Sequence, residues 1–302
     1  MPNTLAHIGL HGLATKAVYR EVDLKWVYLG AILPDLPWIL QRITGTLAPH
    51  VDRLDLRLYV IGQASLFFCL ILSAALALFS RQPLQTFRVL GSGSILHLLL
   101  DTLQHKWANG VHFFAPYSWR LSRFGLVWPE SLPTYLVTAF GLGWCLFYWK
   151  RSLQAAFPLT RPDKKKALTG LSLLIIYFLL PFALLEGPEA QDNHFVKTLR
   201  SSEERKGKVI EMDRADYEYD PAGGKLHLFT GEVFQVEDLH LDHSTTISIR
   251  GVFTEKNRIR VLDHHVHARF RDEASYLGLG LIALLWLGAA YRAYQKPVLE
   301  SI

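Results

Sequence analysis

The chain alternates between long stretches almost free of charge and shorter stretches crowded with charged residues. The apolar stretches approach the length of about 20 residues that a helix needs to cross a bilayer. They predict about seven membrane helices, at 2–19, 26–40, 58–79, 84–104, 133–149, 167–185 and 275–294. We therefore expect a predominantly α-helical polytopic membrane protein.

The region from 188 to 273 has a different pattern. Alternating or β-branched runs are separated by turn signals such as Pro221-Ala222-Gly223-Gly224, as in short strands. The expected strands are 208–213, 225–229, 232–236, 246–253, 258–263 and 265–270. They predict a small all-β insert, an OB-like barrel or a sandwich, between the last two membrane helices. The expected domains are 1–132, 133–187, 188–273 and 274–302.

Composition agrees with a membrane protein, since 50% of the residues are hydrophobic, 20% are charged and the mean hydropathy is +0.16. The net charge of +5 comes largely from basic residues at the ends of apolar stretches. Membrane topology explains such a distribution, so no nucleic-acid partner is expected. Cys69 and Cys145 lie inside apolar stretches and are interpreted as buried side chains rather than a disulfide.

The basic loop 150–166 is placed in the cytoplasm because positive charge accumulates on that side of membrane proteins. This assignment puts the N-terminus and the β-insert outside and the C-terminus in the cytoplasm. We expect an integral protein of a bacterial-type inner membrane. No cleavable signal peptide is expected, because no basic residue precedes Lys16.

Polar residues follow one side of the predicted helix 84–104. His97, Asp101 and His105 are spaced at i, i+4 and i+8, and His112 follows a turn signal at Asn109-Gly110. Imidazole and carboxylate groups are the ligands that a zinc-like cation prefers. The alternative is that these residues cap or hydrogen-bond the end of an ordinary buried helix.

Two earlier segments carry similar groups. His7 and His11 share one helix face, and Asp35 lies between Pro34 and Pro37 within an apolar stretch. A carboxylate there is costly unless it is paired or coordinated, although Asp35 could also cap a helix that restarts beside it. The predicted topology brings these segments to one membrane face. The predicted metal ligands are His7, His11, Asp35, His97, Asp101 and His112, holding one to three divalent ions, most simply zinc, with His105 moving protons.

Residues 1–120 resemble the YdjM-like family of inner-membrane metal-dependent hydrolases, which is also labelled LexA-binding. The matching pieces are His7 in TLAHIGL, GAILPD ending at Asp35, HLLLD from 97 to 101 and PYS at 116–118. Their order is more distantly similar to that of zinc-dependent phospholipase C, which implies phosphodiester hydrolysis at a metal cluster. The chain has Gln-Ala-Ser-Leu at 63–66 where many relatives have Thr-His-Ser-Leu. Either His11 or His50 then substitutes for the missing histidine, or fewer metals bind.

Two functions are compatible with these features. The first is a membrane-embedded metal-dependent hydrolase that acts on a phosphoester or other ester of a lipid or lipid-linked, amphiphilic substrate at the outer membrane face. The second is a non-catalytic anchoring or assembly protein whose β-insert binds an envelope partner. His265 and His267 share a face of a predicted strand, but we interpret them as solvent-facing rather than as metal ligands.

Overall fold

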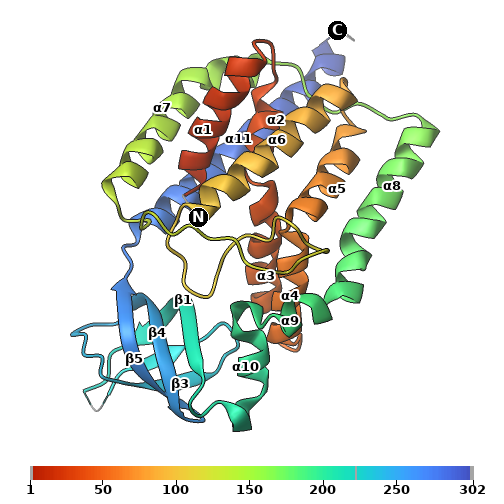
Figure 1. Ribbon diagram of the computed structural model, residues 1–302. Helices are drawn as coiled ribbons and strands as arrows, with labels where there is room; N and C mark the ends of the chain where they lie inside the picture. The colour runs from red at the N-terminus through yellow and green to blue at the C-terminus, as the bar shows by residue number, and fades with distance from the viewer. Residues whose placement is uncertain (1–2, 222, 300–302) are drawn as a thin grey trace.

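The computed structural model describes residues 3–221 and 223–299, which form a helical bundle and a small β-barrel. The bundle occupies the upper part of Figure 1, the barrel lies below it, and the C-terminal end of the last helix points away from the barrel. Helices account for 57% of the residues and strands for 15%, so the fold is mixed α/β rather than predominantly helical. Pro2 and the tail 300–302, which were included in the predicted segments, lie outside the described residues.

Helices form the first part of the chain and return after the barrel. The α-helices are α1 Thr4–Val18, α2 Leu24–Gly30, α3 Leu36–Leu47, α4 Arg53–Gln63, α5 Leu66–Ala77, α6 Pro83–Thr102, α7 Leu132–Gln154, α8 Lys164–Leu179, α9 Glu186–Ala190, α10 Val196–Arg200 and α11 Phe270–Leu299. Short 3-10 helices are η1 Leu33–Asp35, η2 Leu180–Leu184, η3 Asn193–Phe195 and η4 Ser202–Glu204.

The prediction of about seven membrane helices is wrong. Among the described residues, only the helical segments Lys164–Ala190 and Phe270–Gln295 are long and apolar enough to cross a membrane, with a third if α4 and α5 together count as one bent span. The stretch 26–40 is divided because Pro34 and Pro37 occupy first-turn positions of new helices. The stretch 58–79 is divided at Ser65, whose backbone is extended, and the two helices meet at 68°.

Close packing of α1 against α7 organises the bundle. A Cβ added to Gly141 would lie 1.9 Å from the Leu5 carbonyl oxygen, and one added to Gly9 would lie 2.6 Å from the Gly141 Cα. Only glycine permits this approach of the two backbones. Helix α1 also contacts α2, α6 and α11, so its middle is enclosed by other helices. Its buried face, which carries the first histidines, is therefore directed into the bundle.

The β-rich insert is a closed barrel of five strands. The strands are β1 Val209–Glu218, β2 Lys225–His227, β3 Val233–Glu237, β4 Thr245–Glu255 and β5 Arg258–Val266. Their order is β1-β2-β3-β5-β4, with β4 returning to β1 and a parallel pairing only between β3 and β5. Alternate side chains fill the interior, among them Ile210, Phe234, Ile247 and Phe253, each at most 1% exposed.

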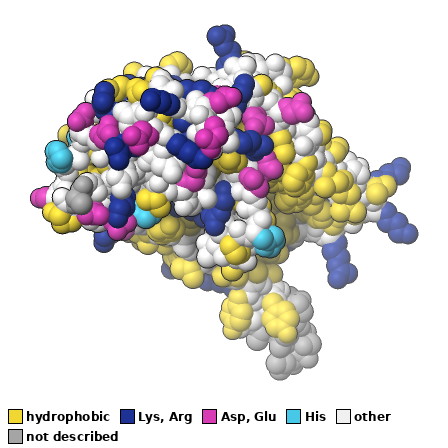
Figure 2. Space-filling model, turned by 90° about the horizontal axis from the view of Figure 1, so that it is seen from below, with side chains coloured by type: hydrophobic (Ala, Val, Ile, Leu, Met, Phe, Trp, Pro, Cys, Tyr) yellow, Lys and Arg dark blue, Asp and Glu magenta, His cyan; other side chains and the backbone are white. Residues whose placement is uncertain are grey.

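The surfaces of the two parts differ in chemistry. Figure 2 shows acidic and basic side chains gathered over the barrel and hydrophobic side chains on the adjoining helical part. The exposed apolar side chains include Leu136 and Phe147 of α7, Leu168 and Leu171 of α8, and Leu284 of α11. Clustered apolar exposure of this kind marks a surface that another phase or partner covers.

Candidate metal centre

Three segments far apart in sequence bring imidazole and carboxylate groups together inside the bundle. His7 lies on the buried face of α1, Asp35 ends η1, and His97 and Asp101 are one turn apart on α6. The two histidines are fully buried, and the two aspartates are 9% and 7% exposed. The His7 and His97 rings are stacked with their centroids 3.9 Å apart. The i, i+4 spacing on α6 and the proline-bounded turn at Asp35 thus serve one common site.

The distances within this cluster are those of ligands around an ion. His7 Nε2 lies 3.5 Å from Asp101 Oδ1, and His97 Nε2 lies 3.4 Å from Asp35 Oδ1 and 3.8 Å from Asp101 Oδ2. Good hydrogen bonds between such atoms are shorter, about 2.7–3.2 Å. Two atoms each about 2.1 Å from one tetrahedral ion lie roughly 3.4 Å apart. The spacing therefore fits a shared cation better than direct pairing.

The backbone of the turn that precedes Asp35 orients the His97 ring and holds a proton on its Nδ1. Its Nδ1–H donates to the Ala31 carbonyl oxygen at 2.7 Å. That carbonyl is free because Pro34 has no N–H, while the Asp35 N–H bonds to the Ile32 carbonyl instead. Nε2 then faces two carboxylate oxygens. This arrangement is favourable if a cation lies between them or if Nε2 is itself protonated, and although burial lowers it, Asp35 and Asp101 raise the pKa of His97. A carbonyl that orients the far nitrogen is typical of metal-bound histidine.

Hydrogen bonding leaves the cluster unsatisfied. Among the described residues, the buried atoms without a hydrogen-bond partner include both nitrogens of His7 and of His11, Asp35 Oδ1, His97 Nε2 and Asp101 Oδ1. Each such atom costs about 1–3 kcal/mol when nothing replaces its water. Lys106 Nζ binds Asp101 Oδ2 at 2.9 Å and balances one carboxylate charge, but within the described part of the chain no lysine or arginine pairs with Asp35. A divalent ion would satisfy both the lone pairs and the remaining charge.

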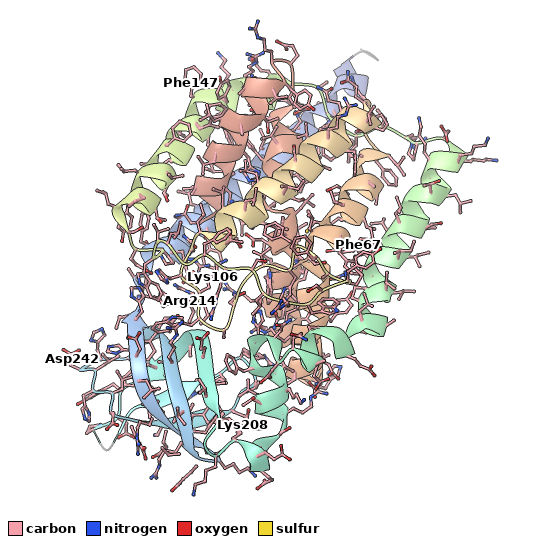
Figure 3. The ribbon with its side chains drawn as sticks, in the orientation of Figure 1. Phe67, Lys106, Phe147, Lys208, Arg214 and Asp242 are labelled. Atoms are coloured by element: carbon pink, nitrogen blue, oxygen red, sulfur yellow. The ribbon has the colours of Figure 1, made fainter. Side chains whose placement is uncertain are left out.

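The cluster lies at one end of a cavity of about 400 Å³ between the bundle and the barrel. Asp35, His97 and Asp101 are among the helical residues that line it, and residues 211–216 of β1 and the loop after β2 line it from the barrel. Figure 3 shows Lys106 and Arg214 where the lower ends of the helices meet the barrel. This volume is in the range of small-molecule sites. A ligand in the cavity would touch the cluster and the barrel together.

Two predicted ligands, His11 and His112, are held in different ways. His11 follows His7 on α1, with its ring centroid 5.7 Å from that of His7 and 6.4 Å from that of His97. His112 lines the cavity, but its Nε2 accepts a hydrogen bond from the Asn193 side chain at 2.9 Å. Burial lowers the pKa of His112 to about 4, so its imidazole is neutral. His11 is thus an unpartnered neighbour of the cluster, whereas His112 already has a partner.

The position at which the family motif differs faces the same cavity. Ala64, where the YdjM-like motif that the sequence resembles has histidine, lines the same cavity as Asp35, His97 and Asp101 and lies at the break between α4 and α5. His50 is exposed in the loop before α4 and is not among the cavity residues. Of the two predicted substitutes, only His11 lies beside the cluster.

His105, the predicted proton carrier, lies elsewhere. Its ring packs on Trp128 with centroids 4.8 Å apart, and it is not among the cavity residues. Trp128 in turn stacks on His265 at 3.7 Å. The loop that follows α6 therefore carries His105 away from the seam of His97 and Asp101 and toward the barrel.

A second group of histidine and carboxylate side chains lies at that place, where the structure joins Glu130 to His265 and His267. Glu130 accepts one hydrogen bond from each imidazole, both at 3.0 Å, and His267 Nε2 bonds to the Ser248 hydroxyl at 2.7 Å. Although burial raises it, the hydrogen bonds from His267 and His265 bring the pKa of Glu130 down to about 2. Like the first group, it has three ligand atoms within 4.8 Å of one another. Both groups could hold an ion, but this one is already satisfied by its own contacts.

Several site residues were not predicted from the sequence. Lys106 directly follows His105 and could have been noticed as a cation beside the predicted seam. His194 lines the cavity from η3, and Glu130 lies before α7, but neither belongs to a spaced motif. Only the fold brings these two residues to their histidine or aromatic partners.

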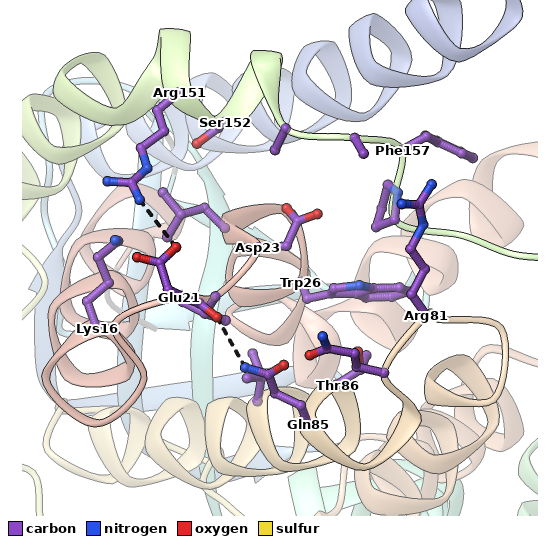
Figure 4. Close-up of a pocket in the computed structure, with 17 residues that line it drawn as sticks. Lys16, Glu21, Asp23, Trp26, Arg81, Gln85, Thr86, Arg151, Ser152 and Phe157 are labelled. Atoms are coloured by element: carbon purple, nitrogen blue, oxygen red, sulfur yellow. Dashed lines mark hydrogen bonds and ion pairs between the residues drawn. The ribbon is translucent and has the colours of Figure 1, made fainter.

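A second cavity lies at the end of the bundle away from the barrel, and the chemistry of its lining differs from that of the first. It has a volume of about 340 Å³ and is lined by the α1–α2 loop, α6 and the end of α7 (Figure 4). Its two carboxylates are paired, since Arg151 contacts Glu21 and Lys25 contacts Asp23. The described residues that line it include no histidine. Its chemistry gives no reason to place a metal there.

Comparisons with known proteins identify no family. No family model, no curated protein and no solved structure matches the chain. The resemblance to YdjM-like hydrolases therefore stays a prediction from the motifs, and the argument for function depends on the geometry of the cluster.

Proposed function

We propose that this protein is a metal-dependent hydrolase whose divalent cation, most simply zinc, is held by His7, Asp35, His97 and Asp101. The observation that carries the proposal is the set of buried, unpartnered nitrogen and oxygen atoms that face one another at 3.4 and 3.5 Å. The chemistry that such an ion supplies is Lewis-acid activation of water and of a phosphoryl or acyl oxygen. The cluster opens into a cavity large enough for a substrate head group.

The chain's own residues have separate roles in this proposal. The Ala31 carbonyl orients His97, and Lys106 holds Asp101 so that its second oxygen faces the cluster. His11 lies behind His7 as a further ligand or as a buried neighbour that excludes water. The barrel closes the outer side of the cavity and limits which substrates reach the cluster.

The substrate that we propose is a phosphoester, or another ester, of a lipid or lipid-linked molecule. Two apolar helices, with a third bent pair, are compatible with membrane association. The lysine run 164–166 begins α8 at the end of the bundle that also holds the C-terminus, and the barrel lies at the other end (Figure 1). By the positive-inside rule, we place the C-terminus in the cytoplasm, and the N-terminus, barrel and cluster at the outer face of a bacterial-type inner membrane.

Elemental analysis of the full chain, purified in detergent, tests the proposal. Wild-type protein should contain stoichiometric divalent metal, and His97→Ala and Asp101→Ala should lose it. His243→Ala is the matched control, because this histidine is exposed and paired only with Asp242. Hydrolysis of phosphomonoester and phosphodiester lipids should be lost in the same two variants. A metal-free wild-type protein after supplementation with zinc, manganese or iron would contradict the proposal and favour a non-catalytic anchoring role.

A further inference from the structure

The side chain of Arg57 is held in the cavity without an anionic partner. Its guanidinium carbon lies 3.9 Å from the centroid of the Phe229 ring and 5.3 Å from that of Trp38. Among the described residues it makes no ion pair, and its Nε is buried with no hydrogen-bond partner. Phe229 comes from the loop after β2, so helix and barrel together fix this cation. A guanidinium held by two aromatic rings keeps its N–H groups oriented for a ligand.

Other cations around the cavity are already engaged. Asp213, whose negative charge faces Arg57, accepts hydrogen bonds from Ser248 and Asn109. The contacts of the remaining cations are Arg53 with the Gly45 carbonyl at 2.7 Å, Arg42 with the Tyr276 hydroxyl at 3.3 Å, Arg214 with Asp272 at 2.6 Å, Arg271 with Asp272 at 3.7 Å and Lys106 with Asp101 at 2.9 Å. Arg214 keeps one free donor, Nη1, but among the described cations that line the cavity Arg57 is the one that makes no hydrogen bond or ion pair.

His194 supplies a second unused group at the same place. It is 8% exposed, packs on Trp38 with ring centroids 5.5 Å apart, and its buried Nε2 has no hydrogen-bond partner. Burial and the nearby Arg57 keep its pKa well below the ordinary value, so the imidazole is neutral and carries one N–H. Its backbone has a left-handed φ of 55°, as do Asp192 and Phe195 at 50° and 58°. Such strain in non-glycine residues is concentrated at functional sites.

Trp38 links these groups to the metal cluster. It lies three residues after Asp35, so the two side chains share a face of the helix about 4.5 Å apart along its axis. Asp35, Trp38, Arg57 and His194 all line the same cavity. A ligand group bound by Arg57 and His194 would then lie in the same cavity as Asp35, His97 and Asp101 of the cluster.

We propose that Arg57 and His194 form an oxyanion subsite that binds a phosphate group of the substrate. The planar guanidinium binds two phosphate oxygens in parallel, and a neutral imidazole N–H binds a third. The inference rests on the proposed hydrolase for the reaction, but the subsite itself needs no metal. It makes the substrate a phosphorylated molecule and assigns its recognition jointly to α4, η3 and the barrel loop that carries Phe229.

Calorimetric titration of the full chain in detergent with inorganic phosphate tests the subsite directly. Each protein is titrated both metal-loaded and stripped with chelator, and its metal content is measured. Arg57→Met should weaken phosphate binding about tenfold to one-hundredfold in both states, because it removes charge-assisted hydrogen bonds. The metal content of the variant should be unchanged. The phosphate affinity of Arg57→Lys should lie between those of the wild-type protein and Arg57→Met, since lysine keeps the charge but not the planar fork.

The matched control is Arg53→Met, one turn away on the same helix and also lining the cavity. Its guanidinium is bound to the Gly45 carbonyl, so we expect less than about a threefold change from the lost charge. Equal losses in both variants would show general attraction by positive charge and would overturn the subsite. Wild-type phosphate affinity in Arg57→Met would overturn it as well. Should Arg57→Met not fold, His194→Gln gives the same comparison.

The two proposals fail in different ways. Phosphate binding that disappears from wild-type protein on stripping the metal would place the anion on the metal alone and overturn the subsite, while the hydrolase stands. A protein that never binds metal but shows phosphate binding dependent on Arg57 would retain the subsite and lose the hydrolase.

Competition identifies the source of the phosphate. Bound phosphate is displaced with glycerol 3-phosphate or with short-chain phosphatidic acid, which carry the same head group. Tighter competition by the lipid assigns the subsite to a lipid head group, and equal competition assigns it to a free phosphorylated metabolite. Displacement by neither compound would contradict the subsite.

Discussion

The two groups of histidine and carboxylate side chains in this protein resemble each other in composition and differ in how they are satisfied. In the bundle, the nitrogen–oxygen distances are 3.4–3.8 Å, and of the facing atoms only Asp101 Oδ2 has a hydrogen-bond partner among the described residues, which is Lys106. In the barrel, Glu130 contacts both of its imidazoles at 3.0 Å. A cluster whose members bind one another needs no ion, whereas a buried cluster whose members do not bind one another is incomplete.

The backbone explains part of this difference. In the bundle, α1, η1 and α6 are rigid helices whose packing sets the separation of the side chains. In the second group, Glu130 lies in an irregular segment just before α7, outside the barrel. This position lets its side chain approach His265, near the end of β5, and His267, just after that strand. Short contacts form where the backbone can adjust, and longer distances between ligand atoms persist where helix packing fixes the backbone.

Removal of metal should have the largest effect and should separate the two groups. We expect the full chain to lose about 4 kcal/mol of stability on chelation when free metal had been about 1,000 times its Kd. Thermal unfolding in detergent, with and without chelator, measures the loss. His97→Ala should be insensitive to chelator, and Glu130→Gln should remain as sensitive as wild type. Chelator sensitivity that survives in His97→Ala but disappears in Glu130→Gln would place the metal at Glu130, His265 and His267 instead.

The helix packing that positions His7 should be the next most sensitive feature. Gly141→Ala places a methyl group against the Leu5 carbonyl, and such overpacking should cost about 3 kcal/mol and displace α1. Metal content should fall in the same variant, because the displaced helix carries His7. Gly143→Ala is the matched control, since an added Cβ there meets nothing within 4 Å. Full metal content in Gly141→Ala would show that the cluster does not depend on this helix contact.

Local patterns predicted the residues of the bundle cluster better than the architecture around them. The spacing of His97 and Asp101, the i, i+4 pair at His7 and the proline-bounded Asp35 are short-range signals, and the fold brings these four side chains together. Strand alternation likewise predicted a small all-β insert, either a barrel or a sandwich, and the structure contains a barrel. Whether the cluster binds metal stays a prediction.

Hydropathy could not predict where the apolar segments break. Averaging over 58–79 gives one membrane span, but an extended residue at Ser65 bends the chain by 68° and turns Ala64 into the cavity. The histidine partners of Glu130 and the contact of Arg57 with Phe229 were also beyond the sequence, because they come from residues more than 100 positions away. No local sequence pattern indicates which distant side chain will contact a given residue in the fold.

Disrupting the group of Glu130, His265 and His267 should reduce stability less than disrupting the metal cluster in the bundle. Glu130→Gln replaces two charge-assisted hydrogen bonds by neutral ones, and we expect a loss of about 2 kcal/mol in the free energy of unfolding. Metal content and chelator sensitivity should not change. Chemical denaturation of the variant, with elemental analysis of the same sample, provides both measurements. A variant that loses metal would contradict our interpretation of this group as a structural network.

The contribution of Glu130 should also depend on pH. Its pKa falls from 4.5 in the unfolded chain to about 2 in the fold, so its stabilising effect is complete above pH 4.5. It is lost as the pH falls from 4.5 toward 2, because the folded state then binds the proton less readily than the unfolded state. The stability difference between wild type and Glu130→Gln should therefore shrink from about 2 kcal/mol toward zero over that range. A constant difference down to pH 3 would show that charge is not its source.

The smallest effect should come from a short histidine–carboxylate contact on the barrel surface. His227 Nε2 lies 2.6 Å from Glu218 Oε2 on the barrel surface, where the two side chains are 44% and 50% exposed. Water and salt screen such a pair, so Glu218→Gln should change the free energy of unfolding by at most about 0.5 kcal/mol. Denaturation at low and high salt provides the measurement, and a loss comparable to that of Glu130→Gln would contradict this ranking. The expected order is then the reverse of the contact distances, because the energy of a histidine–carboxylate group is set by burial and by what remains unsatisfied, rather than by how closely its atoms approach.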